Sequence, residues 1–318
     1  MNVLHGHHHL TLCVGGAQED YTFHSDLLGL KSVKKTILYD GKLPIYHLYY
    51  GNENGDPGTL ITTFSFRHTG LKAERGTGQV RTIACSIPEA ALPFWKERLE
   101  SHGHGVEELE RFGEHRLRFQ HPCGIEYELV GARNDSRQPR GTAEIPEHKA
   151  IRGVHSVTVS VRSIKESAKF MNLAMGFEQT RDDGAGAYHR FEVDGGGPGK
   201  TVEFIVEPDR DQGSWFYGEG IVHHVAFKVN DRDVQKDYKD YLEGLGFTDV
   251  SESKDRGYFH SIYFRTPAGA LFEAAYSVPE GFCVDEPRDR LGHDFILPGF
   301  VDAGRRAEIL AQLEKITY

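Results

Sequence analysis

Two pairs of neighbouring histidines, far apart in the chain, are the residues best suited to do chemistry. The stretch "HGHHHLTLC", residues 5–13, holds four histidines in five positions, and "IVHHVAFKV", residues 221–229, again places His-His before an apolar, β-type run. Neutral imidazoles are common metal ligands, and imidazole also exchanges protons near neutral pH. Because a purification tag does not recur inside a protein, the two pairs indicate a metal or proton-transfer site.

The two pairs stand at equivalent points of a unit that recurs four times. The unit opens with a strand-like segment at residues 8–14, 82–87, 155–161 and 223–229, and aligning these segments gives the equivalents His9, Ile83, Ser156 and His224. Near the end of each unit, the residue four positions after a glycine is Thr62, Glu128, Glu203 and Glu273 in turn. The first and fourth units therefore carry two imidazoles and one carboxylate: His9, His224 and Glu273.

Two imidazoles and one carboxylate suit non-haem Fe(II) and leave coordination positions open for substrate and oxygen. Side chains alternate between the faces of a strand, so either histidine of a pair could be the ligand. We select the residue directly before the apolar run, which leaves His8 and His223 on the opposite face or near the rim. A lone strand histidine is more often a hydrogen-bonded core residue. The repeated pair together with the carboxylate favours the metal site.

The elements that position these residues are predicted to follow the same order in each unit: strand, helix and three further strands. Helix-like segments follow the first strands at residues 17–30, 88–103, 163–177 and 233–247. In the last of them, helical spacing predicts an apolar stripe of Val234, Tyr238, Tyr241 and Leu245. "LGL" and "LGF" place a glycine where a helix ends.

The predicted fold class is α+β, with four βαβββ modules paired into two half-open barrels, because one module cannot bury its sheet face alone. The modules span residues 1–76, 77–132, 151–210 and 211–278, with a polar linker at 133–150 and a tail at 279–318. Since the ligands come from modules one and four, these modules should share the metal-bearing barrel. Modules two and three should form a degenerate barrel, in which Ile83 and Ser156 replace the imidazoles and Glu128 and Glu203 alone make a poor transition-metal site.

The tail contains "AEILAQLEKI", whose apolar residues recur at helical spacing: Ile309, Leu310, Leu313 and Ile316. We expect a helix packed on the body of the protein or on a partner subunit, and we expect a homo-oligomer.

The amino-acid composition argues against some classes of partner and cellular location. The hydrophobic content of 38% and the charged content of 26% fit a soluble globular protein. A formal net charge of −10 argues against a nucleic-acid partner. The chain shows no apolar run of membrane-spanning length and no leader, and its four cysteines lie far apart without a CxxC motif. These features predict a cytoplasmic protein with no membrane partner.

Several long stretches resemble the ring-cleaving dioxygenases of the vicinal oxygen chelate superfamily, especially the hydroquinone and chlorohydroquinone 1,2-dioxygenases. The resemblance rests on "HHLTLCVGGAQEDYTFHSDLLGLKSVKKT", "YDGKLPIYHLYYGNENGDPGTLITTF", "RFGEHRLRFQHPCGIEYELV", "NDSRQP", "GSWFYGEGIVHHVAF" and "DRGYFHSIYFRTPAGALFEA". It covers almost the whole chain. The resemblance implies the paired βαβββ fold, Fe(II) or alternatively Mn(II) as the metal, and a small aromatic substrate with O2 as partners.

Carried over position by position, the family's metal ligands fall on His9, His224 and Glu273. The same resemblance implies an active-site shell of His8, Thr11, His223, Arg256 and Tyr263, with Trp215 and Phe259 as wall candidates. In "GYFHSIYF" the chain has His260 where an acidic residue is usual in the family, and alternation places His260 on the face of Ile262 rather than that of Tyr263.

The shell implies roles for its members. Tyr263 and Arg256 would hydrogen-bond oxygen anions, His8 or His223 would move the phenolic proton, and Thr11 would orient a ligand or water. One alternative is a glyoxalase-type isomerase or transferase, whose metal site generally adds a fourth protein ligand where this chain has Thr62. The other is a non-catalytic aromatic-binding resistance protein, which needs the pocket but no redox metal.

Overall fold

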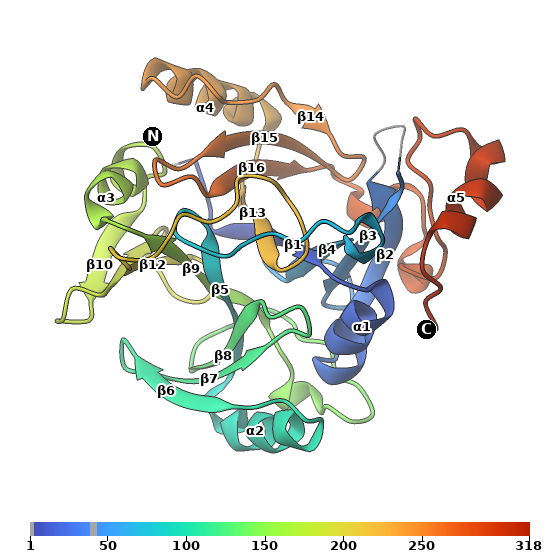
Figure 1. Ribbon diagram of the computed structural model, residues 1–318, viewed down its shortest axis with the longest axis horizontal. Coiled ribbons are helices and arrows are strands. Elements are labelled where there is room, and N and C mark those ends of the chain that lie inside the picture. Colours follow the sequence, from blue (N-terminus) through green and yellow to red (C-terminus); the bar gives the residue numbers. More distant parts are fainter. Residues whose placement is uncertain (1–2, 39–42) are drawn as a thin grey trace.

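The computed structural model describes residues 3–38 and 43–318, which form two curled eight-stranded sheets (Figure 1). In the first sheet the order is β14-β15-β16-β13-β1-β4-β3-β2. Its strands are β1 (His7–Val14), β2 (Lys31–Leu38), β3 (Ile45–Gly51), β4 (Leu60–Ser65), β13 (Ile221–Lys228), β14 (Lys254–Asp255), β15 (Phe259–Arg265) and β16 (Leu271–Ser277).

The second sheet repeats this arrangement with the order β10-β11-β12-β9-β5-β8-β7-β6. Its strands are β5 (Val80–Pro88), β6 (Glu107–Arg111), β7 (Glu114–Gln120), β8 (Glu126–Ala132), β9 (Gly153–Val161), β10 (Glu178–Asp182), β11 (Tyr188–Glu192) and β12 (Thr201–Val206). The first and fourth βαβββ modules therefore share one sheet, and the second and third share the other. The predicted fold class is confirmed.

Strand pairing corrects one of the predicted equivalences. Each closing-strand residue pairs with a residue of the module's first strand, as Thr62↔Thr11, Glu128↔Ala84, Glu203↔Thr158 and Glu273↔Ala226. On each first strand, the residue two positions before the paired residue is the equivalent of His9. These equivalents are His9, Thr82, Ser156 and His224 in modules one to four. The structural equivalent of His9 is therefore Thr82, not Ile83, which packs fully buried in the core. Apolar content alone could not fix the register of this strand, because nearly all of β5 is buried.

The first four helices lie on the outside of the sheets, and the last lies beyond the edge strand β2 of the first sheet (Figure 1). They are α1 (Ala17–Tyr21), α2 (Leu92–Ser101), α3 (Ile164–Leu173), α4 (Arg232–Gly244) and α5 (Arg306–Gln312). The first predicted helix is short and continues as a π-helical turn over Thr22–Leu27. Gly29, Gly176 and Gly246 follow three of the helical segments with φ of +72°, +70° and +96°, the left-handed conformation that ends a helix at glycine.

The apolar stripe predicted for α4 is wrong in part. Tyr238 is fully buried, but the other buried residues of the helix are Gln235 and Leu242, whereas Leu245 lies beyond the helix and is exposed. Gln235 is tolerated inside because its amide donates to the carbonyl oxygens of His260 and Ala274, both at 2.8 Å.

The tail helix packs on the body of the protein. Ile309 and Leu313 are buried, and the Glu314 carboxylate accepts a 2.6 Å hydrogen bond from the backbone N–H of Ala17 at the start of α1. Nearer the start of the tail, Asp285 and Glu286 both pair with the buried ammonium group of Lys34 in β2. The tail thus closes the outer edge of the first sheet.

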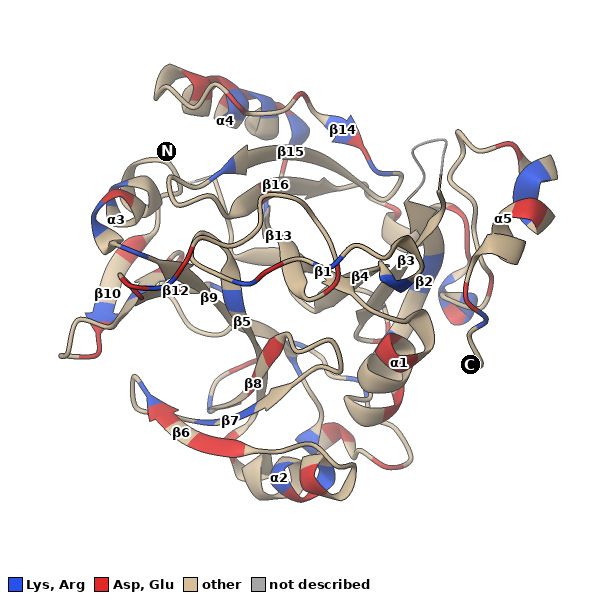
Figure 2. Ribbon diagram, viewed as in Figure 1, with Lys and Arg blue, Asp and Glu red and all other residues tan. Residues whose placement is uncertain are grey.

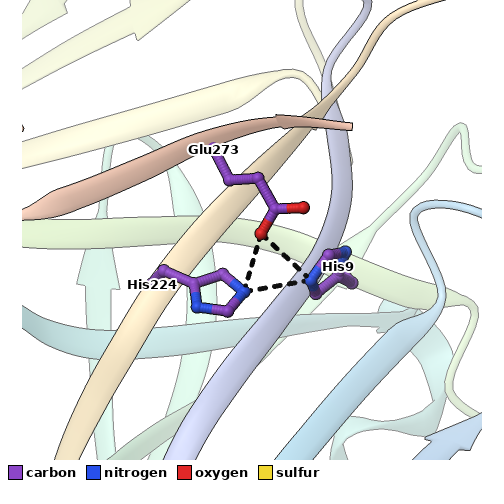
Figure 3. A group of neighbouring side chains, drawn as sticks. All are labelled: His9, His224 and Glu273. Carbon is purple, nitrogen blue, oxygen red and sulfur yellow. Dashed lines mark hydrogen bonds and ion pairs between the residues drawn. The ribbon is translucent and has the colours of Figure 1, made fainter. Parts of the chain in front are cut away.

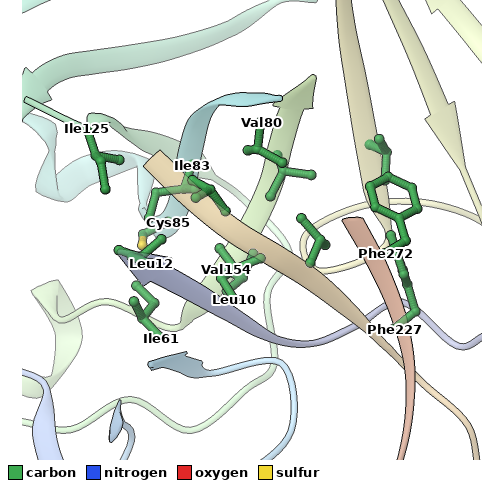
Figure 4. Close-up of a cluster of buried hydrophobic side chains, with 14 of the residues drawn as sticks. Leu10, Leu12, Ile61, Val80, Ile83, Cys85, Ile125, Val154, Phe227 and Phe272 are labelled. Atoms are coloured by element: carbon green, nitrogen blue, oxygen red, sulfur yellow. The ribbon is translucent and has the colours of Figure 1, made fainter. Parts of the chain in front are cut away.

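One core joins the two sheets. Figure 4 shows Leu10 and Leu12 of β1 in one cluster with Ile83, Cys85 and Val154 of the second sheet. Charged residues of both signs gather on α2, α4 and α5, whereas β1 at the centre carries none (Figure 2). Within residues 3–38 and 43–318, no helix combines the length and apolarity that crossing a membrane requires.

Candidate metal centre

The structure brings His9, His224 and Glu273 together, although the first and the last stand 264 positions apart in the sequence (Figure 3). His9 comes from β1, His224 from the neighbouring β13, and Glu273 from β16 on the far side of β13. The Nε2 atoms of the two histidines are 3.0 Å apart, and Oε2 of Glu273 lies 2.9 Å from that of His224 and 3.6 Å from that of His9. All three side chains are buried.

This triangle fits a cation. Two donor atoms that each lie about 2.1 Å from a metal and 90° apart are about 3.0 Å from one another, and wider angles give somewhat longer separations. Oε2 of Glu273 is also buried without a hydrogen-bond partner, which is costly for a carboxylate oxygen. Its other oxygen accepts a 2.5 Å hydrogen bond from Ser261. The bond from Ser261 holds the carboxylate in place with Oε2 directed toward the two imidazole nitrogens. Together these three donor atoms suit a divalent transition metal.

The histidine pairs have a structural explanation that alternation does not give. Pairing between β1 and β13 skips one residue on each strand, and the skipped residues are His8 and His223. A β-bulge redirects side chains, so both members of a pair reach the same site. The prediction that His8 and His223 lie on the opposite face or at the rim is wrong for His8, which is 1% exposed beside His9, whereas His223 is half-buried and lines a surface cleft, as a place near the rim predicts.

Each skipped histidine supports its neighbour. Nδ1 of His8 lies 2.9 Å from Nδ1 of His9, and Nδ1 of His223 lies 2.8 Å from Nδ1 of His224. When the inner imidazole donates from Nδ1, its Nε2 lone pair is free for a metal, which is the usual arrangement of a ligating histidine. Burial lowers the pKa of His8 to about 4 and that of His224 to about 3, so these imidazoles are neutral at physiological pH.

The remaining shell residues lie around the triangle. Thr11 Oγ1 is 2.9 Å from His224 Nε2, and the Tyr263 ring meets the His224 ring edge-on at 5.6 Å. The Nε–H group of Arg256, an exposed residue, donates to the Tyr263 hydroxyl at 3.1 Å. Burial, followed by the Glu273 carboxylate, raises the pKa of Tyr263, which keeps its phenol group protonated and able to donate. Phe259 packs on His9 with ring centres 4.9 Å apart.

Two further residues from the sequence analysis lie outside the triangle. Trp215 is 60% exposed, and the Arg265 guanidinium lies 5.1 Å from its ring centre; Trp215 lines a surface cleft together with His223 and His224. His260 stacks on Tyr276, and the hydrogen bond that its carbonyl oxygen accepts from Gln235 places this segment under α4. As alternation predicts, His260 faces away from Tyr263.

Sequence reasoning missed several residues of the site. Tyr217 stacks on His223 with ring centres 3.7 Å apart, and Ser277 lies 2.7 Å from His8 Nε2. His47 and Tyr49 reach the site from β3. For this pair a signal existed, because the two side chains alternate in "IYHLYY" with the period of two that points both to one face.

At the corresponding place in the second sheet, arginines surround the carboxylates. Arg116 is fully buried and contacts Glu128 and Glu203, each at 2.7 Å. Arg111, Arg118 and Arg190 add further contacts to the same carboxylates. Burial alone would raise the pKa of Glu203, but the guanidinium groups of Arg116 and Arg111 hold it well below its usual value. A cluster of guanidinium groups thus occupies the place of a cation, and the hydroxyls of Thr82 and Ser156 replace the two imidazoles.

A second group of possible ligands, Asp20, His24 and His121, is better explained as a buried cluster of one carboxylate and two imidazoles. Among the described residues, Oδ1 of Asp20 and Nε2 of His121 nevertheless lack a hydrogen-bond partner, as Oε2 of Glu273 does. Oδ2 of Asp20 accepts hydrogen bonds from Tyr50 and Thr63 at 2.8 and 2.7 Å, while Oδ1 faces the two imidazoles at 3.1 and 3.3 Å. Nδ1 of His121 accepts from the backbone N–H of Cys123, so its proton lies on Nε2, the atom that faces Asp20. In this tautomer Nε2 of His121 has no lone pair for a metal, in contrast to the first site, where each ligand imidazole can keep its proton on Nδ1.

Comparison with known proteins places this geometry in context. Residues 153–274 match the Glyoxalase/Bleomycin resistance protein/Dioxygenase superfamily. Over 91% of its length the chain is 43% identical to chlorohydroquinone/hydroquinone 1,2-dioxygenase of Sphingobium indicum, of which it covers 90%. Over 92% of its length it is 34% identical to MhqO of Bacillus subtilis, named as a candidate ring-cleaving dioxygenase, of which it covers 91%.

Solved structures agree with these relatives. The chain superposes with a TM-score of 0.91 on the crystal structure of a candidate dioxygenase from Bacillus subtilis, at 32% identity, covering 100% of this chain and 99% of the other. Maize glyoxalase I shares the fold, with a TM-score of 0.61 at 18% identity over 85% of this chain and 92% of the other.

Proposed function

Since this chain belongs to the Glyoxalase/Bleomycin resistance protein/Dioxygenase superfamily, we propose that it is a ring-cleaving dioxygenase that opens a hydroquinone with O2 at an Fe(II) centre. The ring would be unsubstituted or carry methyl or chlorine groups. The observation that carries the proposal is the buried triangle of His9, His224 and Glu273, three donors that could hold one metal ion and would leave further coordination positions for substrate and O2. Bound Fe(II) supplies the redox chemistry between an aromatic ring and O2, which protein side chains lack.

The side chains around this triangle would bind and orient the substrate. Two neutral imidazoles and one carboxylate offset one of the two charges of Fe(II), which leaves a site that attracts a phenolate. The Tyr263 hydroxyl, held by Arg256, is placed to donate to oxygen atoms of the substrate that gain negative charge. His8 and His223 keep the ligand imidazoles in the required tautomer.

The site also favours this proposal over an isomerase of the same fold. A fourth ligand would stand at Thr62, but its hydroxyl hydrogen-bonds to Thr11 at 2.8 Å, and a neutral hydroxyl is a weak ligand. Among the described residues, the group that can surround one ion here has three members. Open positions on the metal are what a reaction with O2 requires.

The direct test loads the protein with Fe(II) anaerobically, adds hydroquinone, methylhydroquinone or chlorohydroquinone, and then admits O2. We expect no change in ring absorbance before O2 and loss of ring absorbance with equimolar O2 uptake afterwards. The protein loaded with Zn(II) is the control and should consume no O2. Turnover by the Zn(II) form, or conversion of a substrate without O2, would support the isomerase instead.

Replacement of Tyr263 by phenylalanine tests the proposed donor. The ring and its contact with His224 remain, while the hydroxyl is lost. We expect kcat to fall about 10²–10³-fold, the range for removal of one oxyanion donor, with iron content unchanged. Steady-state O2 uptake and elemental analysis measure both quantities, and an unchanged kcat would remove Tyr263 from the mechanism.

A further inference from the structure

A narrow surface cleft borders the candidate metal centre, and the function proposed above gives the cleft no role. His224, one of the three candidate ligands, is among its lining residues, and so is the neighbouring His223. Five aliphatic side chains also belong to its walls: Val80, Ile221, Val222, Ala270 and Leu271. A small molecule held in this cleft therefore lies against apolar side chains and next to the metal centre.

Aromatic rings line the same cleft. The Tyr217 ring stacks on the His223 ring with ring centres 3.7 Å apart, and Tyr217 and Trp215 both belong to the walls. Trp215 is 60% exposed, although tryptophan is a highly buried residue on average. Since aromatic rings stack on one another favourably, the exposed indole offers a contact surface for a planar aromatic molecule.

Arg265 holds both of these rings. Its guanidinium lies over the Trp215 ring, 5.1 Å from the ring centre, and donates to the Tyr217 hydroxyl at 3.1 Å. The same guanidinium donates to the carbonyl oxygen of Gly269 at 2.7 Å, which fixes its own position. A cation over an indole ring is attracted to the ring, so Arg265 keeps the exposed Trp215 side chain at the cleft.

The backbone that carries Trp215 is anchored on both sides. The Ser214 N–H donates to the carbonyl oxygen of Glu74 at 3.0 Å, and the Glu219 N–H donates to that of Leu71 at 2.9 Å. The segment therefore runs along a neighbouring part of the chain, and Trp215 projects from a fixed base toward solvent.

We propose that this cleft is an entry subsite, in which the ring of the hydroquinone stacks on Trp215 before the hydroquinone reaches the metal. This inference rests on the proposed function, which supplies the identity of the ligand. An ordinary phenol has a pKa of about 10, so a hydroquinone is neutral at physiological pH and ring stacking rather than charge supplies the contact. In this subsite Trp215 is a substrate-binding residue, and Arg265, which acts through Trp215, is a positioning residue.

Tryptophan fluorescence reads this subsite directly, because the chain has two tryptophans and the other, Trp95 of α2, is fully buried. Metal-free protein is titrated anaerobically with methylhydroquinone. We expect saturable quenching of the emission, with an unchanged lifetime of the remaining emission, in the wild type and no saturable quenching in Trp215→Phe. Cyclohexane-1,4-diol, which has two hydroxyl groups but no aromatic ring, should not compete. Quenching of the wild type that only rises linearly, as for free N-acetyltryptophanamide, would overturn the subsite.

Phe216 supplies the matched control. It is 54% exposed beside Trp215 but does not line the cleft, so Phe216→Ala should keep the quenching curve of the wild type. Arg265→Met keeps an unbranched apolar stem and loses the guanidinium, and it should raise the half-quenching concentration about fivefold. Arg265→Lys keeps a cation and should restore binding in part. An unchanged curve in Arg265→Met, or an equally large change in Phe216→Ala, would overturn the proposal.

Kinetics of the Fe(II) form give a second readout. Trp215→Ala should lower kcat/KM for methylhydroquinone about tenfold through a higher KM, while iron content equals that of the wild type. Phe216→Ala should leave kcat/KM unchanged. Equal kcat/KM values for Trp215→Ala and the wild type would overturn the subsite. Absence of O2 uptake by the wild type would instead contradict the proposed function, and the titration of metal-free protein tests the subsite separately.

Discussion

The His224→Ala variant is expected to purify without iron and to consume no O2 with methyl- or chlorohydroquinone. His224 is the ligand closest to both of the others, at 3.0 Å from His9 and 2.9 Å from Glu273. Loss of a partner outside the ligand shell typically costs about 10–100-fold in metal affinity, so loss of a ligand should cost more. Elemental analysis after reconstitution and an oxygen electrode measure the two effects.

His260→Ala is the matched control. It removes an imidazole from the same barrel, but one that stacks on Tyr276 and faces away from Tyr263. We expect iron content and O2 uptake equal to those of the wild type. Full activity in His224→Ala would end the metal-centre proposal, while loss of iron in His260→Ala would show that imidazole removal acts through general destabilisation.

The predicted fold and the metal-facing residues depend on features that a sequence displays directly. The repeated unit, the glycines that end helices and the carboxylate at a fixed distance from a glycine are local patterns, and pairing of modules one and four follows from where the histidines stand. The two errors of register have different causes. Regular alternation ignores bulges, so it misplaced His8, and burial along almost the whole of β5 leaves no pattern that fixes the position of Thr82 relative to Ile83.

The arginine cluster of the second sheet was not predictable, because it depends on contacts across strands. Arg111 and Arg116 belong to β6 and β7, and they meet Glu203 of β12 only when two modules share a sheet. His47 was missed for the same reason. Its link to Thr62 crosses from β3 to β4, and no local pattern shows that Thr62 in turn hydrogen-bonds to Thr11 of β1.

The equivalent carboxylates Glu128 and Glu273 should give opposite results when each is replaced by glutamine. Glu128 is surrounded by Arg111, Arg116 and Arg118, so its neutralisation leaves buried guanidinium groups short of a partner. We expect the free energy of unfolding to fall by about 3–5 kcal/mol, the usual cost of breaking a buried ion pair, while kcat per folded molecule is unchanged. Chemical denaturation and O2 uptake at low temperature measure the two quantities.

Glu273→Gln should instead lose iron and activity and keep its stability. In the metal-free protein, Oε2 of Glu273 has no hydrogen-bond partner, so neutralising this buried anion removes little that stabilises the fold. The two variants change the same atoms at equivalent strand positions, and their difference therefore reports what surrounds each carboxylate. Iron loss in Glu128→Gln, or a large loss of stability in metal-free Glu273→Gln, would contradict the assignment of one barrel to the metal and the other to an internal ion cluster.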